Sequence, residues 1–327
     1  MKKTKVFSLI SIFIASTLFF NSCNKNNSKL DSKNSISVVA TTFPCYDAVR
    51  AVAGDLLGTS VSLKLLVKPG MEIHSYDPSP ADIIAVQKSD LFVYVGGESD
   101  EWVEKVLKSS DKELNCEPLT LMHFVKTVDE VEFDDAEDEH DHDENEHEQD
   151  EHIWTSPENE LIIIRAVCTY LSKIAEKKGL STLPETFESN AAAYCEQIET
   201  LIEKTSQIIA SKQEKLLIMA DRFPFIYFTN YYGLEFDAAF SGCSTAVEAS
   251  TQTISRLIDT VKAKQLPAVF YIELGNHKIA DSIAESTKTK ALLLESCQNV
   301  SKTNFENGET WVTLMNKNAD TLNIGLK

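Results

Sequence analysis

Histidine and carboxylate side chains are concentrated in one stretch of the 327-residue chain, from Glu132 to His152. The stretch holds thirteen Asp or Glu residues and no Lys or Arg. Its four histidines are His140, His142, His147 and His152. Neutral imidazoles among carboxylates bind divalent cations of intermediate softness, zinc above all. Such a composition cannot fold alone, so we expect residues 132–151 to form a mobile loop that handles metal. An acidic linker that only keeps the chain soluble is the alternative.

The charge balance of the whole chain limits its partners. The formal net charge is −19, and the balance outside the acidic stretch is near −6. Nucleic acid is not expected as a partner, because phosphate binding needs clustered Lys and Arg. A hydrophobic content of 43% is typical of a globular protein, and the length suits two domains of ordinary size.

Residues 1–23 are predicted to be a lipoprotein signal peptide. A lysine-rich start precedes an apolar run from Val6 to Phe20, which is too short for a comfortable membrane span. The cysteine at the expected cleavage point, Cys23, predicts lipidation and an anchor in the bacterial cell membrane. Ordinary secretion is the alternative. The polar residues 24–35 predict a flexible tether.

Six cysteines follow the signal peptide, and none of them forms a CxxC pair. Their spacing is not that of a small disulfide scaffold. We therefore expect buried free thiols for most of them. These cysteines are Cys45, Cys116, Cys168, Cys195, Cys243 and Cys297.

Short apolar runs rich in β-branched residues alternate with helical patterns along the chain. Strands are predicted over residues 36–40, 61–67, 91–95, 215–219, 268–272 and 291–294. Helices are predicted over residues 45–53, 79–88, 99–109, 158–178, 184–211, 223–232, 248–264, 277–285 and 310–322. This alternation predicts an α/β fold with parallel strands, divided into an N-terminal lobe (36–181) and a C-terminal lobe (214–327).

The longest helical pattern lies between the two predicted lobes, within residues 182–213. At about 1.5 Å per residue it would extend roughly 40 Å, which is long enough to connect both halves. A helix packed inside one lobe is the alternative. In open α/β sheets, ligands bind beyond the carboxyl ends of the strands. His74, Asp221 and Gln298 each follow a predicted strand end, so they would converge if the lobes face each other.

Several sequence blocks resemble the zinc and manganese solute-binding lipoproteins of bacterial ABC transporters, the ZnuA- and TroA-like cluster A-I. The most specific are PGMEIH, which ends at His74, and HIW, which begins at His152, with the acidic stretch before the second. The others are VVATTFP at 38–44, DLFVYVGG at 90–97, YYGLEFDAAFSGCSTAVEAS at 231–250 and LPAVFYIE at 266–273. The resemblance extends from Val38 to Leu326.

The resemblance implies two α/β lobes, each with a parallel sheet, joined by a long rigid helix, with a metal held between them. His74 and His152 match the two histidine ligands of the family. Asp221 and Gln298 are the closest matches to the other two ligands, and here the chain departs from the family pattern. A helix N-cap is the alternative role for Asp221. Glu248 and His277 are further candidates. The implied metal is Zn²⁺, with Mn²⁺ as the alternative.

The function implied is a monomeric, lipid-anchored receptor outside the cytoplasm, which delivers metal to an ABC permease and its ATPase. We expect His140, His142 and His147 to raise the local zinc concentration. Deleting Asp134–Gln149 should then leave tight binding intact. A surface adhesin or metal chaperone on the same fold is the alternative. A zinc hydrolase is less favoured, because the sequence contains no HExxH or GxSxG motif.

Overall fold

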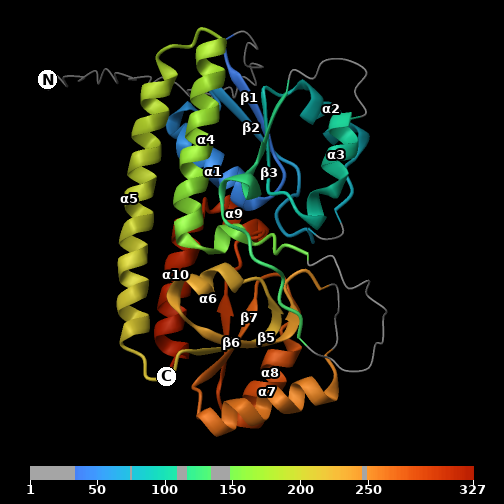
Figure 1. The fold of residues 1–327 in the computed structure, drawn as a ribbon, viewed down its shortest axis with the longest axis vertical. Helices are drawn as coiled ribbons and strands as arrows, with labels where there is room; N and C mark the ends of the chain where they lie inside the picture. The colour runs from blue at the N-terminus through green and yellow to red at the C-terminus, as the bar shows by residue number, and fades with distance from the viewer. Residues whose placement is uncertain (1–33, 74–75, 109–115, 134–147, 245–248) are drawn as a thin grey trace, which may run out of the picture.

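Two parallel β-sheets, each of four strands, form the centres of two lobes that lie end to end along the molecule (Figure 1). This computed structural model describes residues 34–73, 76–108, 116–133, 148–244 and 249–327. Helices flank both sheets, so the predicted α/β fold class is confirmed. The predicted signal peptide, Cys23 and most of the predicted tether lie outside the described residues.

The N-terminal lobe is built on a sheet with the strand order β2-β1-β3-β4. Its strands are β1 (Ile36–Ala40), β2 (Val61–Leu65), β3 (Leu91–Tyr94) and β4 (Glu117–Thr120). Its helices are α1 (Phe43–Ala53), α2 (Pro80–Lys88) and α3 (Glu101–Lys108), with the 3₁₀ helices η1 (Gly54–Leu56), η2 (Glu98–Asp100) and η3 (Leu121–Phe124). Successive side chains of β1 face opposite sides of the sheet, so Val38 packs in the core with α1 and Val39 packs with α2 and α3.

The C-terminal lobe repeats this plan with the strand order β6-β5-β7-β8. Its strands are β5 (Leu216–Phe223), β6 (Glu235–Ser241), β7 (Ala268–Ile272) and β8 (Lys290–Leu294). Its helices are α6 (Ile226–Tyr232), α7 (Thr251–Lys264), α8 (Lys278–Thr287), α9 (Lys302–Glu306) and α10 (Trp311–Gly325). In both sheets every strand pair is parallel, so the loops after the strands gather at one end of each sheet.

Two helices lie side by side in Figure 1, and the longer of them, drawn in yellow, runs along both lobes. They are α4 (Pro157–Lys177) and α5 (Leu183–Ala210), and α4 follows the short 3₁₀ helix η4 (Ile153–Thr155). α5 packs against α1 and α4 of the N-terminal lobe and also against α10 of the C-terminal lobe. The long helix therefore joins the two lobes, and the alternative of a helix inside one lobe is wrong.

The predictions missed β4, β6 and α9. β4 and β6 are edge strands, where one side needs no strand partner and charged residues such as Glu117 and Asp237 are tolerated. Their sequences are therefore less apolar than those of the central strands. β5 is longer than the predicted 215–219, because pairing with β6 resumes after a register shift between Met219 and Arg222.

Part of the predicted loop 132–151 is firmly placed. The Glu130 amide donates to the Glu148 carbonyl at 2.9 Å, and the Asp150 amide donates to the Val128 carbonyl at 2.9 Å. Asp150 and Glu151 are buried. The prediction of a mobile loop is therefore wrong for residues 148–151, because backbone pairing with residues 128–130 holds them. His140, His142 and His147 lie outside the described residues.

The six cysteines in the described part of the chain are all free thiols. Five are buried, and Cys243 is half-buried. The prediction of buried free thiols for most of them is confirmed. Among the described helices, none combines the length and apolarity that crossing a membrane requires.

Candidate metal centre

His152 lies in the segment between the two lobes, at the position that precedes η4. Its side chain has no solvent exposure, so His152 does not simply belong to a flexible run of histidines. Trp154, two residues later, is also buried and donates from its indole nitrogen to the Ser296 carbonyl at 2.9 Å. The Trp311 indole donates in turn to the Trp154 carbonyl at 3.0 Å. These two bonds fix the segment of His152 to the C-terminal lobe.

The imidazole of His152 is oriented by Asp150. One oxygen of this buried carboxylate accepts the His152 backbone amide at 2.8 Å and lies 3.1 Å from the ring nitrogen Nδ1. Burial alone would lower the pKa of His152, but the carboxylates of Asp150, Glu151 and Glu130 outweigh it and raise that pKa. A carboxylate on one ring nitrogen is the usual support of a metal-binding histidine, because it fixes the ring and its tautomer.

Hydrogen bonds between the lobes hold the loop that leads to His74, although His74 itself lies outside the described residues. The Asn299 side-chain amide donates to the carbonyls of Lys68 and Met71 at 3.0 and 2.8 Å. Glu72 forms an ion pair with Arg222 at 3.3 Å. The loop after β2 therefore lies against β5 and against the loop after β8.

Asp221 is part of β5 and not of a turn before a helix, so the N-cap alternative is wrong. Its Oδ1 accepts the Arg222 amide at 2.8 Å, and its Oδ2 accepts the Ile272 amide at 3.3 Å. Burial raises the pKa of the Asp221 carboxyl. Gln298 is buried in the loop after β8, and its backbone amide donates to the Ser296 hydroxyl at 3.1 Å.

The two further candidates are placed differently. His277 precedes α8, its side chain is half exposed, and its Nε2 lies 3.5 Å from Asp281. Its ring contacts Tyr271, with 5.1 Å between the ring centroids. This histidine therefore lies at the surface beside Asp281. Glu248 lies outside the described residues.

Sequence reasoning did not single out Glu151 or Cys243 as ligands. Within the described ranges, these two residues and His152 form one group whose ligand atoms all lie within 4.8 Å of one another. Cys243 follows the carboxyl end of β6, the edge strand that the predictions missed. Had β6 been identified, the rule that ligands bind beyond strand ends would have pointed to it.

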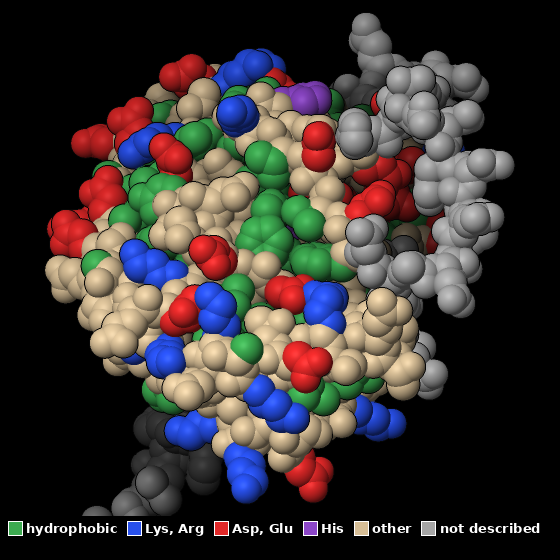
Figure 2. Space-filling view, turned by 60° about the horizontal axis from the view of Figure 1, so that its bottom comes forward, with side chains coloured by type: hydrophobic (Ala, Val, Ile, Leu, Met, Phe, Trp, Pro, Cys, Tyr) green, Lys and Arg blue, Asp and Glu red, His purple; other side chains and the backbone are tan. Residues whose placement is uncertain are grey.

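A pocket of about 240 Å³ lies beside this group, and we call it the cleft pocket. Its lining residues are Gly97, Glu98, Glu101, Glu130, Glu148, Gln149, Glu151 and Cys243. Burial raises the pKa of Glu98 and Glu151, and neighbouring carboxylates raise the pKa of Glu98 further. In Figure 2, acidic side chains gather in a recess beside the grey residues, whereas the rest of that face carries both signs of charge.

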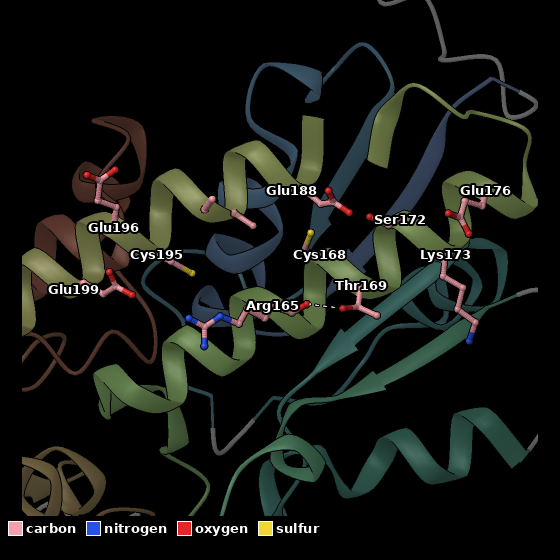
Figure 3. A pocket seen from close by; sticks show the side chains of 12 residues that line it. Arg165, Cys168, Thr169, Ser172, Lys173, Glu176, Glu188, Cys195, Glu196 and Glu199 are labelled. Carbon is pink, nitrogen blue, oxygen red and sulfur yellow. Dashed lines mark hydrogen bonds between the residues drawn. The ribbon is translucent and has the colours of Figure 1, made fainter. Parts of the chain in front are cut away.

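A larger cavity, of about 730 Å³, lies between α4 and α5, and we call it the helix groove. Figure 3 shows the thiols of Cys168 and Cys195 pointing into the space between the helices, while the charged side chains point in different directions. Lys173, for example, pairs with Glu117 of β4. The helix groove offers no convergent set of metal ligands among the described residues.

Comparisons with known proteins agree with this architecture. Zinc-binding lipoprotein AdcA of Streptococcus pneumoniae (strain ATCC BAA-255 / R6) is 28% identical over 315 residues, which cover 96% of this chain and 60% of that protein. High-affinity zinc uptake system protein ZnuA of Bacillus subtilis (strain 168) is 27% identical over 328 residues, 98% of either protein. This chain thus spans about 60% of the length of the AdcA relative.

A solved structure supports the fold. The crystal structure of the Zn(II)-bound ZnuA-like domain of Streptococcus pneumoniae AdcA superposes with a TM-score of 0.71 at 24% identity, over 89% of this chain and 99% of that one. The family model described as "ZnuA: Zinc-uptake complex component A periplasmic" matches residues 38–325, which include both lobes. The family resemblance is thereby confirmed, and the chain belongs to this family of periplasmic zinc-uptake components.

Proposed function

We propose that this protein is a receptor outside the cytoplasm that captures Zn²⁺ between its lobes and delivers it to an ABC permease and its ATPase. One observation carries the proposal: His152 is fully buried between the lobes, with its Nδ1 held by the buried Asp150. This arrangement is typical of a zinc ligand. The names of the relatives, a zinc-binding lipoprotein and a zinc uptake protein, support the same metal.

The ligand set we propose is His74, His152, Asp221 and Gln298, with Mn²⁺ as the competing metal. Support comes from the contacts between the lobes, since the Glu72–Arg222 ion pair joins the loop before His74 to the residue after Asp221. Three segments of the two lobes thus meet at the loop that leads to His74. Bound metal would add a further link between them, and this occupancy signal is what a permease could recognise.

Zinc titration of the soluble form that starts at Asn24 tests this proposal, with His74→Ala and His152→Ala as variants. His277→Ala is the matched control, because this histidine is half exposed and pairs with Asp281 at the surface. We expect one tight zinc per chain, lost in both cleft variants and retained in the control. The absence of a tight zinc site in the unmodified protein would refute a role as a zinc receptor.

Delivery to a permease needs its own measurement. Cells are made to express the full chain with Cys23→Ala. The variant protein in their extracts should bind zinc normally, but the cells should take up less zinc, because the lipid anchor is expected to keep the receptor beside its transporter. If zinc uptake were unchanged when the protein is absent from the cells, the proposed partners and the proposed anchor would both be wrong. A binding role without catalysis is part of the same proposal.

The acidic loop is proposed to concentrate zinc and not to bind it tightly. The structure narrows the deletion that tests this, because Glu148 and Gln149 pair with residues 129 and 130 and line the cleft pocket. Removing residues 134–147 should leave the tight zinc affinity within about threefold. A loss of about a thousandfold, which corresponds to roughly 4 kcal/mol, would show that the loop contributes a ligand.

A further inference from the structure

The group formed by Glu151, His152 and Cys243 brings together three kinds of metal donor that the sequence separates widely. We propose that Glu151 and Cys243 join His152 as ligands of the captured metal, and that the Cys243 thiolate makes the site prefer Zn²⁺ to Mn²⁺. This inference rests on the proposed function, because His152 belongs to both ligand sets.

The geometry places the donors at a suitable separation. Their ligand atoms all lie within 4.8 Å of one another. Ligands at zinc lie about 2.0–2.3 Å from the metal, so two of them can be separated by at most roughly twice that distance. The 4.8 Å limit is close to that maximum, so small side-chain movements can bring the three donors onto one ion.

Each new donor is held in place by its neighbours. The Glu151 carboxylate accepts hydrogen bonds from the Ser99 amide at 3.1 Å and the Ser99 hydroxyl at 2.5 Å. The Cys243 amide donates to the Glu130 carboxylate at 2.8 Å. Outer contacts of this kind orient metal ligands. The donors are therefore positioned before metal arrives.

Gly242 allows the close approach of Cys243 and His152. A β-carbon at this position would lie 3.0 Å from Cε1 of the His152 ring and 3.0 Å from the Phe223 carbonyl. With any other residue at this position, the end of β6 or the imidazole would have to shift by a few tenths of an ångström. Because the backbone at Gly242 contacts the imidazole, the next side chain, that of Cys243, lies within reach of a metal bound to His152.

The charges of the three donors suit a divalent cation of intermediate softness. A thiolate and a carboxylate together supply two negative charges, and the neutral imidazole adds a nitrogen donor. When metal binds, the S–H bond of Cys243 breaks, an S–metal bond forms, and the proton passes to solvent. Thiolate and imidazole ligands suit Zn²⁺, whereas Mn²⁺ prefers carboxylate, carbonyl and water oxygens. Cys243 is therefore the donor that separates the two metals.

The other proposed ligands leave room for additional donors. Asp221 offers a carboxylate, which is a hard oxygen donor. Gln298 offers only a neutral oxygen. Neither residue supplies the soft, charged donor that favours zinc, and Cys243 supplies it from the end of the neighbouring strand β6. The cleft pocket is also lined from both lobes, by Glu98 of the N-terminal lobe and Cys243 of the C-terminal lobe, so a metal held there would tie the lobes together.

Cobalt substitution tests the inference, because Co²⁺ bound to a thiolate shows a charge-transfer band in the near ultraviolet. The soluble form starting at Asn24 is loaded with Co²⁺ as the unmodified protein, as Cys243→Ser and as Cys195→Ser. The last variant is the matched control, since Cys195 lies in the helix groove. Zinc affinity and competition by Mn²⁺ are measured on the same three proteins.

We expect the band in the unmodified protein and in Cys195→Ser, and its loss in Cys243→Ser. The zinc affinity of Cys243→Ser should fall at least about tenfold, as even outer-shell changes can cause. Its affinity for Mn²⁺ should change less, so the preference for zinc narrows. Glu151→Gln should weaken zinc binding but keep the band, which gives a second variant that tests the site without replacing a cysteine.

Two other results separate this inference from the proposed function. Tight zinc binding with no thiolate band, and an unchanged affinity in Cys243→Ser, would overturn the role of Cys243 while the receptor function stands. A band that persists in Cys243→Ser would assign the thiolate to another cysteine and also overturn it. If the unmodified protein binds neither metal tightly, the proposed function fails and the inference fails with it.

Discussion

The cleft pocket and the helix groove differ in how their side chains are arranged as well as in size. The helix groove is about 730 Å³ and the cleft pocket about 240 Å³. Yet the smaller one lies beside the group of Glu151, His152 and Cys243, while the charged side chains of the larger one point in different directions (Figure 3). The comparison teaches that a metal site is defined by convergent donors held by other contacts, and not by the volume of a cavity.

The origin of each cavity explains the contrast. The helix groove lies between two helices, whose side chains fan outward, so its residues come from α4 and α5 alone. The cleft pocket takes its residues from loops that follow strands, from η2 and α3, and from the segment before His152. Loops from separate elements can aim their side chains at one point, as they do at the cleft pocket.

Replacing His152 should have the largest effect of any single change. His152→Ala removes the buried imidazole that both proposed ligand sets share, and we expect zinc affinity to fall by at least about a hundredfold, the upper end of what outer-shell changes cost. Competition titration with a zinc indicator measures this. An affinity within threefold of the unmodified protein would show that the metal binds elsewhere. The cleft pocket would then differ from the helix groove in shape but not in metal binding.

Gly242→Ala should weaken zinc binding about tenfold without removing a ligand. The added methyl group would press on the His152 ring and on the Phe223 carbonyl, each 3.0 Å away. The crowding should also cost about 1–3 kcal/mol of the free energy of unfolding. Calorimetric zinc titration and urea denaturation of the same protein separate the two effects. A variant that loses stability but keeps full affinity would indicate that the approach of Gly242 to His152 serves packing only.

Glu160 provides a buried carboxyl outside the cleft pocket for comparison. It is fully buried in α4, burial raises its pKa well above the usual value, and Asp47 raises it further. The folded protein therefore keeps a proton that the unfolded chain releases above about pH 4.3, so stability falls as pH rises from there toward the raised pKa.

Glu160→Gln should remove this part of the pH dependence, which amounts to about 1.4 kcal/mol per pH unit within that window. Urea denaturation of metal-free protein at about pH 5 and about pH 8 measures the change, and the variant should gain stability relative to the parent at the higher pH. Equal pH profiles would indicate that Glu160 ionises in the folded protein. Zinc affinity should not change, since Glu160 does not line the cleft pocket.

The smallest effect is expected in the helix groove. Cys168→Ser and Cys195→Ser place a polar hydroxyl where a buried thiol lies, so we expect a loss of about 1 kcal/mol in the free energy of unfolding. Zinc affinity should remain within about twofold. A larger loss of affinity in either variant would mean that the helix groove is linked to the metal, and the distinction between the two cavities would need revision.

Prediction from sequence succeeded best where the local pattern is strong. The run from Ile36 to Ala40 gave β1 at its observed bounds, and the central strand β7 was also placed correctly. The edge strands β4 and β6 were missed, because each carries charged residues, such as Glu117 and Asp237, and lacks a clear apolar run. Because β6 was not predicted, Cys243 was not recognised as a residue that follows the end of a strand.

The candidate site was predictable only in part, for the same reason. His152 was identified from its motif, and the structure places it in full burial beside Asp150. Asp221 was expected after a strand, but it lies within β5, because pairing with β6 continues past a register shift. The periodicity of residues along one strand does not reveal such a shift, because the shift depends on pairing with the neighbouring strand.

The sequence by itself determined the two lobes, the long helix between them and the family, because buried strands, helical stripes and motifs are local properties of the chain. Only the tertiary structure decided which side chains share the cleft pocket. Glu151 and Cys243 meet because residues 128–130 pair with residues 148–150, and because Gly242 lets the end of β6 touch the His152 ring. Such contacts between distant segments arise from packing, and local sequence patterns carry no record of them.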